Sequence, residues 1–323
     1  MSESNDNFQL YKPEHHCLNA GHLKRTPDFK CPRLRLLTLV YSDLVPQGLS
    51  VISEDDIFDQ ETVMIETAHL VYFSPTGTTR TTCAQIAKGL SAKRIIDYDV
   101  TLPGDPLTTT LSEGVVIFGV PVYAGRVPEL CLQRFASISA QGLPCILVAL
   151  YGNREFEDAL VELRDVVTKQ GFQVVAAAAF IGEHSYSTPE RPIAAGRPNA
   201  DDLATAEEFG QEVAAKLRNN DFSMPAIDGN TPYRERVPLG GVAPETNSGK
   251  CILCGKCAEV CPTGVIEVSE TVSTNAANCV MCCACVKICE VGARPFNHPR
   301  IEERRAMLRQ NCKRPKAPVL FLV

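Results

Sequence analysis

Residues 251–262 read CILCGKCAEVCP, and residues 279–289 read CVMCCACVKIC. Both stretches follow the spacing C-x2-C-x2-C-x3-C. A zinc site pairs two C-x2-C hairpins, so it needs neither the third cysteine of such a run nor the fourth. The doubled spacing is instead typical of iron–sulfur ligation, in which each run contributes to two [4Fe-4S] clusters.

The order of the cysteines predicts how the two runs share the clusters. Three thiolates on one tight loop bind three irons of a cubane, and the fourth thiolate points to the other cluster. The first predicted ligand set is Cys251, Cys254, Cys257 and Cys289. The second predicted ligand set is Cys279, Cys282, Cys285 and Cys261. Two adjacent clusters indicate one-electron transfer.

The composition limits the class of protein. The chain has 323 residues, 45% of them hydrophobic, which suffices for one medium domain and one small domain. The net charge of -6 gives no basic field that would attract nucleic acid or an anionic membrane. Fifteen cysteines behind an N-terminus without an apolar signal segment predict a reducing, cytoplasmic setting. No stretch approaches the roughly 18–20 apolar residues of a membrane span.

The pattern of the chain predicts five parts. Residues 1–65 lack periodicity, and we expect a weakly ordered or peripheral extension. Over residues 66–219, strand-like and helix-like segments alternate, which predicts an α/β domain with a doubly wound, five-stranded parallel sheet. Residues 220–245 are predicted to be a linker, residues 246–300 the cysteine-rich domain, and residues 301–323 a tail that docks on the protein itself.

The individual elements of the α/β domain can be placed from their apolar patterns. Strands are predicted at 69–73, 94–97, 115–120, 145–151 and 174–180, and the later ones read as apolar runs covered on both faces. Helices are predicted at 79–90, 127–138, 155–170 and 201–217, with a charged helix at 301–310 in the tail. In the extension, the residues His15, His16, Cys17, His22 and Cys31 match no standard metal-site spacing.

A second candidate site follows the first predicted strand, where residues 74–79 read SPTGTT before a helix. A tight turn at a helix N-terminus presents free N–H groups and the positive end of the helix dipole to an anion. Walker and G-x-G-x-x-G patterns are absent, so a single phosphate is the predicted ligand and a plain helix cap is the alternative. The predicted binding residues are Ser74, Thr76, Gly77, Thr78 and Thr79.

Two later loops are expected beside this turn, because ligands of open α/β sheets bind at the carboxyl ends of the strands. Tyr123 and Tyr151 supply rings for a planar heterocycle, and Arg126 and Arg154 are predicted to offset its negative charge. The loops contribute Pro121, Val122, Tyr123, Ala124, Gly125, Arg126, Tyr151, Gly152, Asn153 and Arg154.

The three loops resemble the FMN-binding loops of flavodoxins, and residues 67–300 resemble the flavodoxin-fused 2[4Fe-4S] ferredoxins of anaerobic bacteria and archaea. Residues 182–187 (GEHSYS) and 192–198 (PIAAGRP) also resemble that family. The resemblance implies a flavodoxin-like domain with FMN, a small α+β bacterial-type ferredoxin domain with two [4Fe-4S] clusters, and electron transfer. The second run departs from the pattern, because Glu290 follows Cys289 where ferredoxins usually have proline.

Some residues leave two interpretations open. Cys283 is an extra cysteine in the second run, either a packed thiol or a spare ligand. His184, Ser185 and Tyr186 either cover the outer face of the flavin or pack against the ferredoxin region. Three further cysteines are expected in the core, namely Cys83, Cys131 and Cys145.

Three functions fit these patterns. The first is a soluble electron carrier that serves redox partner proteins. The second is an FMN-dependent reductase of a quinone, nitro compound or enone, fed by its own clusters, although no catalytic residue is assigned. The third is a redox or iron sensor. A homodimer is expected if the linker keeps the flavin and the clusters far apart.

Overall fold

The computed structural model describes residues 65–105, 107–238 and 240–323. The first 64 residues of the predicted extension, including the histidines and cysteines between positions 15 and 31, lie outside the described residues. The predictions for that segment therefore stay predictions.

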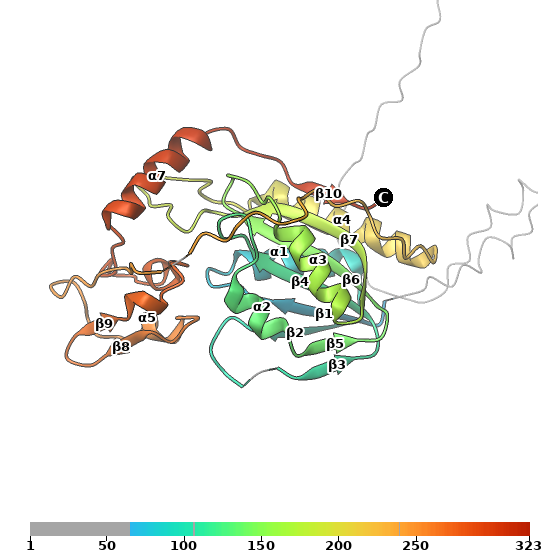
Figure 1. Cartoon of the computed structure of the whole chain (residues 1–323), viewed down its shortest axis with the longest axis horizontal. Helices are drawn as coiled ribbons and strands as arrows, with labels where there is room; N and C mark the ends of the chain where they lie inside the picture. The colour runs from blue at the N-terminus through green and yellow to red at the C-terminus, as the bar shows by residue number, and fades with distance from the viewer. Residues whose placement is uncertain (1–64, 106, 239) are drawn as a thin grey trace, which may run out of the picture. The chain divides into compact units, whose positions relative to one another are not determined.

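A six-stranded sheet of order β10-β7-β6-β4-β1-β2 forms the centre of the α/β domain (Figure 1). Its strands are β1 (Thr67–Tyr72), β2 (Arg94–Asp99), β4 (Val115–Pro121), β6 (Leu143–Tyr151), β7 (Phe172–Ile181) and β10 (Val319–Phe321). The first five pair in parallel, and counted along the chain their order is 2-1-3-4-5, as in flavodoxin-like sheets. The five predicted strands are confirmed, each within two residues at either end.

The sixth strand comes from the C-terminal tail. β10 pairs antiparallel with β7, with Val319 opposite Ala179 and Phe321 opposite Ala177. It covers a sheet edge that would otherwise expose unpaired N–H and C=O groups. The predicted docking of the tail is thus observed. The sheet has six strands rather than the expected five, because β10 is added to the five parallel strands.

Four helices cover the two faces of the sheet, and they are α1 (Thr78–Leu90), α2 (Glu129–Phe135), α3 (Ala159–Lys169) and α4 (Ala200–Arg218). On one face, Ile86 of α1 and Phe209 of α4 are fully buried. On the other, Phe135 of α2 and Leu163 of α3 pack against the sheet. In the described ranges, no helix combines the length and apolarity that crossing a membrane requires.

The predicted helix at 127–138 is too long at both ends, because α2 spans Glu129–Phe135 and Ile138 already belongs to a separate strand. β5 (Ile138–Ala140) pairs in parallel with β3 (Thr109–Leu111) beside the main sheet. Strands of three residues are too short to show an alternation in the sequence.

The cysteine-rich region consists of two similar loops and a hairpin. Its elements are α5 (Lys256–Glu259), β8 (Ile266–Val268), β9 (Val272–Thr274), the 3-10 helix η3 (Ala276–Asn278) and α6 (Ala284–Lys287), followed by α7 (Pro299–Asn311) in the tail. Gly255 with φ 80° begins α5, and Cys283 with φ 62° begins α6. The two cysteine runs therefore share a left-handed backbone conformation at the residue before their short helices.

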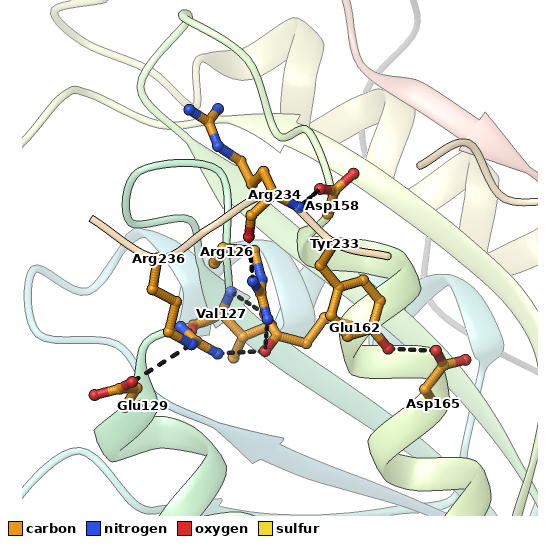
Figure 2. A network of polar contacts seen from close by, with 9 residues as sticks. All are labelled: Arg126, Val127, Glu129, Asp158, Glu162, Asp165, Tyr233, Arg234 and Arg236. Carbon is orange, nitrogen blue, oxygen red and sulfur yellow. Dashed lines mark hydrogen bonds and ion pairs between the residues drawn. The ribbon is translucent and has the colours of Figure 1, made fainter. Parts of the chain in front are cut away.

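The predicted linker is held on α3 and its N-terminal turn by a polar network (Figure 2). The Asp158 carboxylate accepts hydrogen bonds from the backbone N–H of Asn230 at 2.8 Å and of Arg234 at 2.7 Å. The Tyr233 hydroxyl donates to Asp165, and Glu162 pairs with Arg236. These contacts lead the chain from the sheet to the cysteine-rich region along a defined route.

Candidate redox site

A cavity of about 330 Å³ lies at the carboxyl ends of β1, β4, β6 and β7. This is the edge at which open α/β sheets bind ligands. The predicted cofactor residues that line it are Thr76, Thr78, Thr79, Pro121, Val122, Tyr123, Ala124, Tyr151, Gly152 and Arg154. His184, Ser185 and Tyr186, from the loop after β7, form a further part of the wall.

The turn before α1 has the form expected of an anion site. Gly77 adopts φ 85° and begins the helix, whose first turn carries no acidic side chain. Ser74 and Gly77 are not among the residues that line the cavity, and their predicted role at the phosphate stays a prediction. Ser74 instead closes the turn: its carbonyl accepts from Gly77 N–H at 3.1 Å, and its hydroxyl accepts from Arg80 N–H at 3.1 Å.

The side chain of His184 lines the cavity and is uncharged at neutral pH. Burial, followed by the positive charges of Arg154, Lys287 and Arg305, lowers the pKa of His184 to about 4. Its Nδ1 accepts a hydrogen bond from Tyr186 N–H at 3.0 Å, so the neutral ring carries its proton on Nε2.

The ring of His184 also explains the glycine opposite it. A Cβ on Gly152 would overlap the imidazole, so only glycine lets β6 end this close to the loop after β7.

The two predicted arginines take different positions. Arg154 lines the cavity and makes two hydrogen bonds of 2.9 Å to Glu157. Arg126 does not line that cavity, and its prediction as a cofactor residue is not supported. Its guanidinium turns to the buried Glu162, with bonds of 2.9 and 2.8 Å (Figure 2). Gly125 also stays outside the cavity, because its Cα faces the Glu157 carboxylate.

Asn153 binds the tail of the chain rather than the cavity. Its side-chain amide donates to the carbonyls of Cys312 at 2.8 Å and Arg314 at 2.9 Å. Its side-chain oxygen accepts from Lys316 N–H at 2.9 Å. The loop after β6 is thereby fastened to the segment between α7 and β10.

The four cysteines of the second predicted set, Cys261, Cys279, Cys282 and Cys285, line one small cavity of about 20 Å³. Met281 N–H donates to the sulfur of Cys279 at 3.4 Å. Burial raises the pKa of Cys282 to about 12 and that of Cys285 to about 11. Because the thiolate is the ligating form, positive charge from a bound metal cluster is needed to offset this burial.

The cysteines of the first predicted set lie nearer the surface. Cys254 is exposed, Cys251 and Cys289 are partly exposed, and only Cys257 is buried. Lys256 and Glu290 form an ion pair of 2.6 Å that joins the two runs. The assignment of this set stays a prediction.

Across the described part of the chain, no three His, Cys, Asp or Glu side chains are arranged to hold one metal ion. A cubane is bound through four different irons, so its thiolates stand farther apart than the ligands of a single ion. The four cysteines of the second set line the small cavity together with Cys283, and their role as cluster ligands stays a prediction.

The cysteine-rich region and the sheet cavity meet at one segment. Val280 and Met281, which stand between Cys279 and Cys282, line the sheet cavity. Val280 also lines the small cavity of the second cysteine set. Burial and then the nearby Cys282 raise the pKa of Tyr123 well above its usual value. Val280 thus borders both cavities, whereas Tyr123 lines the sheet cavity.

The loop after β7 lines the sheet cavity and packs against the cysteine-rich region, so both of the roles that the sequence left open remain compatible with its position. Tyr186 lines the sheet cavity and also packs against Met281, Cys283 and Phe296 of the cysteine-rich region. Cys283 is buried in this cluster, and its thiol donates to the Met281 carbonyl at 3.6 Å. Cys283 also lines the small cavity of the second cysteine set, so both interpretations of this cysteine stay open.

Sequence reasoning missed the part of the wall that comes from the linker, the second cysteine run and α7. These residues are Arg234, Val237, Val280, Met281, Arg304, Met307 and Leu308. The sequence did carry a signal for Val280 and Met281 in the second cysteine run. Apolar side chains cannot bind iron, so they would be expected to pack against another part of the chain. On α7, the spacing of Arg304, Met307 and Leu308 marks one helix face.

Comparison with known families identifies the first cysteine run. The family model of the 4Fe-4S binding domain matches residues 244–267. The comparison with curated proteins gives no match. The chain therefore joins a domain of flavodoxin-like strand order to a ferredoxin-type 4Fe-4S binding region.

Solved structures similar to the α/β domain include several flavodoxins. A flavodoxin from the domain Archaea is 15% identical, covers 47% of this chain and 99% of its own, and gives a TM-score of 0.32. The Fusobacterium nucleatum flavodoxin bound to flavin mononucleotide is 15% identical, covers 48% of this chain and 98% of its own, and gives a TM-score of 0.33. Scores this low add no argument, so the fold assignment depends on the strand order.

Proposed function

We propose that this chain carries electrons between FMN, bound in the sheet cavity, and two [4Fe-4S] clusters, bound by the crossed cysteine sets. FMN exchanges one or two electrons and each cluster exchanges one, so together they convert two-electron into one-electron transfer. The observation that carries the proposal is the position of Val280, which lines both the sheet cavity and the cavity of the second cysteine set.

The sheet cavity fits FMN in charge and in size. The N-terminus of α1 has no acidic residue in its first turn, so its N–H groups and the Thr78 and Thr79 hydroxyls suit the phosphate. Tyr123, Tyr151 and His184 line the cavity and would hold the flavin ring. The volume of about 330 Å³ lies within the range of about 300–1,000 Å³ that ligand pockets have.

The proximity of the two cavities supports an order of electron transfer. The second cluster lies next to the flavin, because Val280 and Met281 stand between two of its proposed ligands. The first cluster is the outer one, since Cys254 is exposed. Transfer within one chain is then the simpler proposal, and a homodimer is not required for it.

The surface around Cys254 is the proposed docking site for a redox partner. Ile252 and Leu253 are 67% and 43% exposed beside it. We infer that a ferredoxin-type donor protein contacts them in a small, transient interface. The double change I252E/L253E should slow reduction by such a protein at least about tenfold and leave reduction by dithionite unchanged. Equal slowing with both reductants would contradict the docking site.

The proposal is tested by anaerobic reductive titration of the purified protein, followed by visible absorbance and EPR. Iron, sulfide and FMN are assayed on the same sample. About eight irons and one FMN per chain are expected from two cubane clusters and one flavin site. Iron without flavin would mean that the α/β domain serves only as a docking module. It would overturn the proposed conversion of two-electron into one-electron transfer.

A second function, reduction of a small molecule, is favoured by one observation: His184 and Tyr186 both line the sheet cavity. In this case the flavin would pass its electrons to a quinone, nitro compound or enone. His184 would donate a hydrogen bond from Nε2 rather than a proton, because its pKa of about 4 keeps it neutral at pH 7. Rapid oxidation of the reduced protein by a quinone, lost in His184→Phe, would support the reductase.

A further inference from the structure

Arg294 is a buried cation between the two predicted cluster sites. It is 2% exposed and follows the second cysteine run. Its guanidinium donates hydrogen bonds to the hydroxyls of Thr246 and Thr274, the latter at 2.7 Å. Its Nη2 also lies 3.9 Å from the sulfur of Cys285, a ligand of the second proposed cluster.

Arg294 differs from the other buried arginines in its lack of an anion. In the described residues, the buried arginines are Arg126, Arg294 and Arg305. Arg126 pairs with Glu162 and Arg305 with Glu302. Within residues 65–105, 107–238 and 240–323, Arg294 forms no ion pair with a carboxylate, and its Nε is buried without a hydrogen-bond partner. An uncompensated buried charge is costly, so a counter-charge must come from elsewhere.

Cysteine sulfur beside the guanidinium is a source of negative charge when it binds a cluster. On one side, Arg294 donates to Cys285 of the second set. On the other, the neighbouring Ala293 N–H donates to the sulfur of Cys289 in the first set at 3.1 Å. Four thiolates on a 2+ core give each cluster a net charge of about -2, so the proposed clusters would supply the missing anion from both sides.

We propose that Arg294 is a shared counter-charge that raises the reduction potential of both [4Fe-4S] clusters. This inference rests on the proposed function, because it requires that the clusters are bound. In the titration, one electron from dithionite reduces one cluster and makes it more negative. A buried cation stabilises the reduced form more than the oxidised form, because screening by water is weak there. Removing the cation should therefore make both clusters harder to reduce.

A purely structural role is the alternative. Arg294 ties Thr246 to Thr274 on β9, and a neutral side chain of similar length would lose these hydrogen bonds as well as the charge. The variants must therefore separate charge from shape. Arg294→Met keeps a long side chain without the charge. Arg294→Lys keeps the charge but loses the planar set of N–H donors of the guanidinium. Thr246→Val removes the hydrogen bond from Arg294 and the one that the Thr246 hydroxyl donates to the Val272 carbonyl, and it leaves the cation in place.

The test is an EPR-monitored redox titration of the full chain, with iron content measured on each sample. Lys256→Gln is the matched control, because Lys256 is an exposed cation in the first cysteine run, paired with Glu290. We expect Arg294→Met to lower both midpoint potentials by at least about 59 mV, a tenfold shift in the one-electron equilibrium. Arg294→Lys, Thr246→Val and Lys256→Gln should shift them much less.

Each outcome decides for or against the role of the charge. Unchanged potentials in a fully loaded Arg294→Met protein would overturn the inference. If Arg294→Met loses iron while Arg294→Lys keeps it, the charge is needed and the inference stands. If both variants lose iron, the shape of the side chain is what matters and the inference fails. Absence of cluster signals in the wild type would instead refute the proposed function.

Discussion

The ring of Tyr186 meets the ring of Phe296 edge-on, with centroids 6.1 Å apart and planes at 86°. Tyr186 belongs to the loop after β7, and Phe296 follows the second cysteine run. This contact joins the wall of the sheet cavity to the cysteine-rich region. The two halves of the proposed relay are therefore in contact through side chains.

Replacing Phe296 by alanine should weaken that contact. Phe296 is 3% exposed, and loss of a buried phenylalanine costs about 3–5 kcal/mol. We expect a lower urea midpoint and slower reduction of the flavin by the clusters, measured by stopped-flow absorbance. The exposed Met224 offers a control, since Met224→Ala should change neither. An unchanged rate of flavin reduction in Phe296→Ala would place the electron path elsewhere.

His184 should make stability depend on pH. Its pKa is about 4 in the folded protein and about 6.5 when unfolded. Below pH 6.5 the unfolded chain binds more protons at this site, so stability falls as the pH falls towards 4. Between pH 7 and pH 5, wild type should lose about 2 kcal/mol more than His184→Gln in urea unfolding. Parallel pH curves for the two proteins would show that His184 titrates normally.

Arg126→Gln should affect stability rather than flavin binding. Arg126 and Glu162 form a buried ion pair of 2.8 Å, and breaking such a pair costs about 3–5 kcal/mol. The FMN dissociation constant, measured by fluorescence quenching below the unfolding transition, should stay within about twofold. Arg154→Gln is the comparison, because Arg154 lines the cavity and its loss should weaken FMN binding. A large loss of FMN affinity in Arg126→Gln would restore its predicted cofactor role.

Asn153→Asp tests how the tail is fastened. Aspartate keeps the oxygen that accepts from Lys316 N–H but loses the donors to Cys312 and Arg314. Asn153 has φ 63°, which aspartate also tolerates, so the backbone should not change. Loss of two hydrogen bonds should cost about 1–3 kcal/mol and speed hydrogen exchange at β10. Full protection of β10 in this variant would mean that pairing with β7 alone holds the tail.

Cys283→Gly separates the two interpretations of the extra cysteine. Cys283 has φ 62° where the first run has Gly255, so glycine fits the backbone. We expect unchanged iron content, because the thiol packs in the contact with Tyr186. Cys282→Ser should lose the second cluster and about half of the iron. A similar loss in Cys283→Gly would show that Cys283 is a ligand.

Local patterns predicted most of the α/β domain. The parallel strands β1, β4, β6 and β7 are mostly apolar runs and α4 begins at a capping box of Asn199 and Asp202, so their signals lie within a few residues. β3, β5 and β10 were not predicted, because three residues carry no periodicity and their pairing partners are distant. The site shows the same division. The loops at the strand ends were found, whereas the roles of Arg126 and Asn153 depend on partners in other parts of the chain.

The sequence by itself determined which residues are able to bind clusters, because cysteine spacing acts over one tight loop and survives any arrangement of the rest. It also predicted a parallel α/β sheet from the alternation of strand-like and helix-like segments. Only the tertiary structure decided that Val280 lies between two cavities and that Arg294 is buried without a carboxylate. Such relations come from the packing of segments far apart in the chain, and neither composition nor spacing records them.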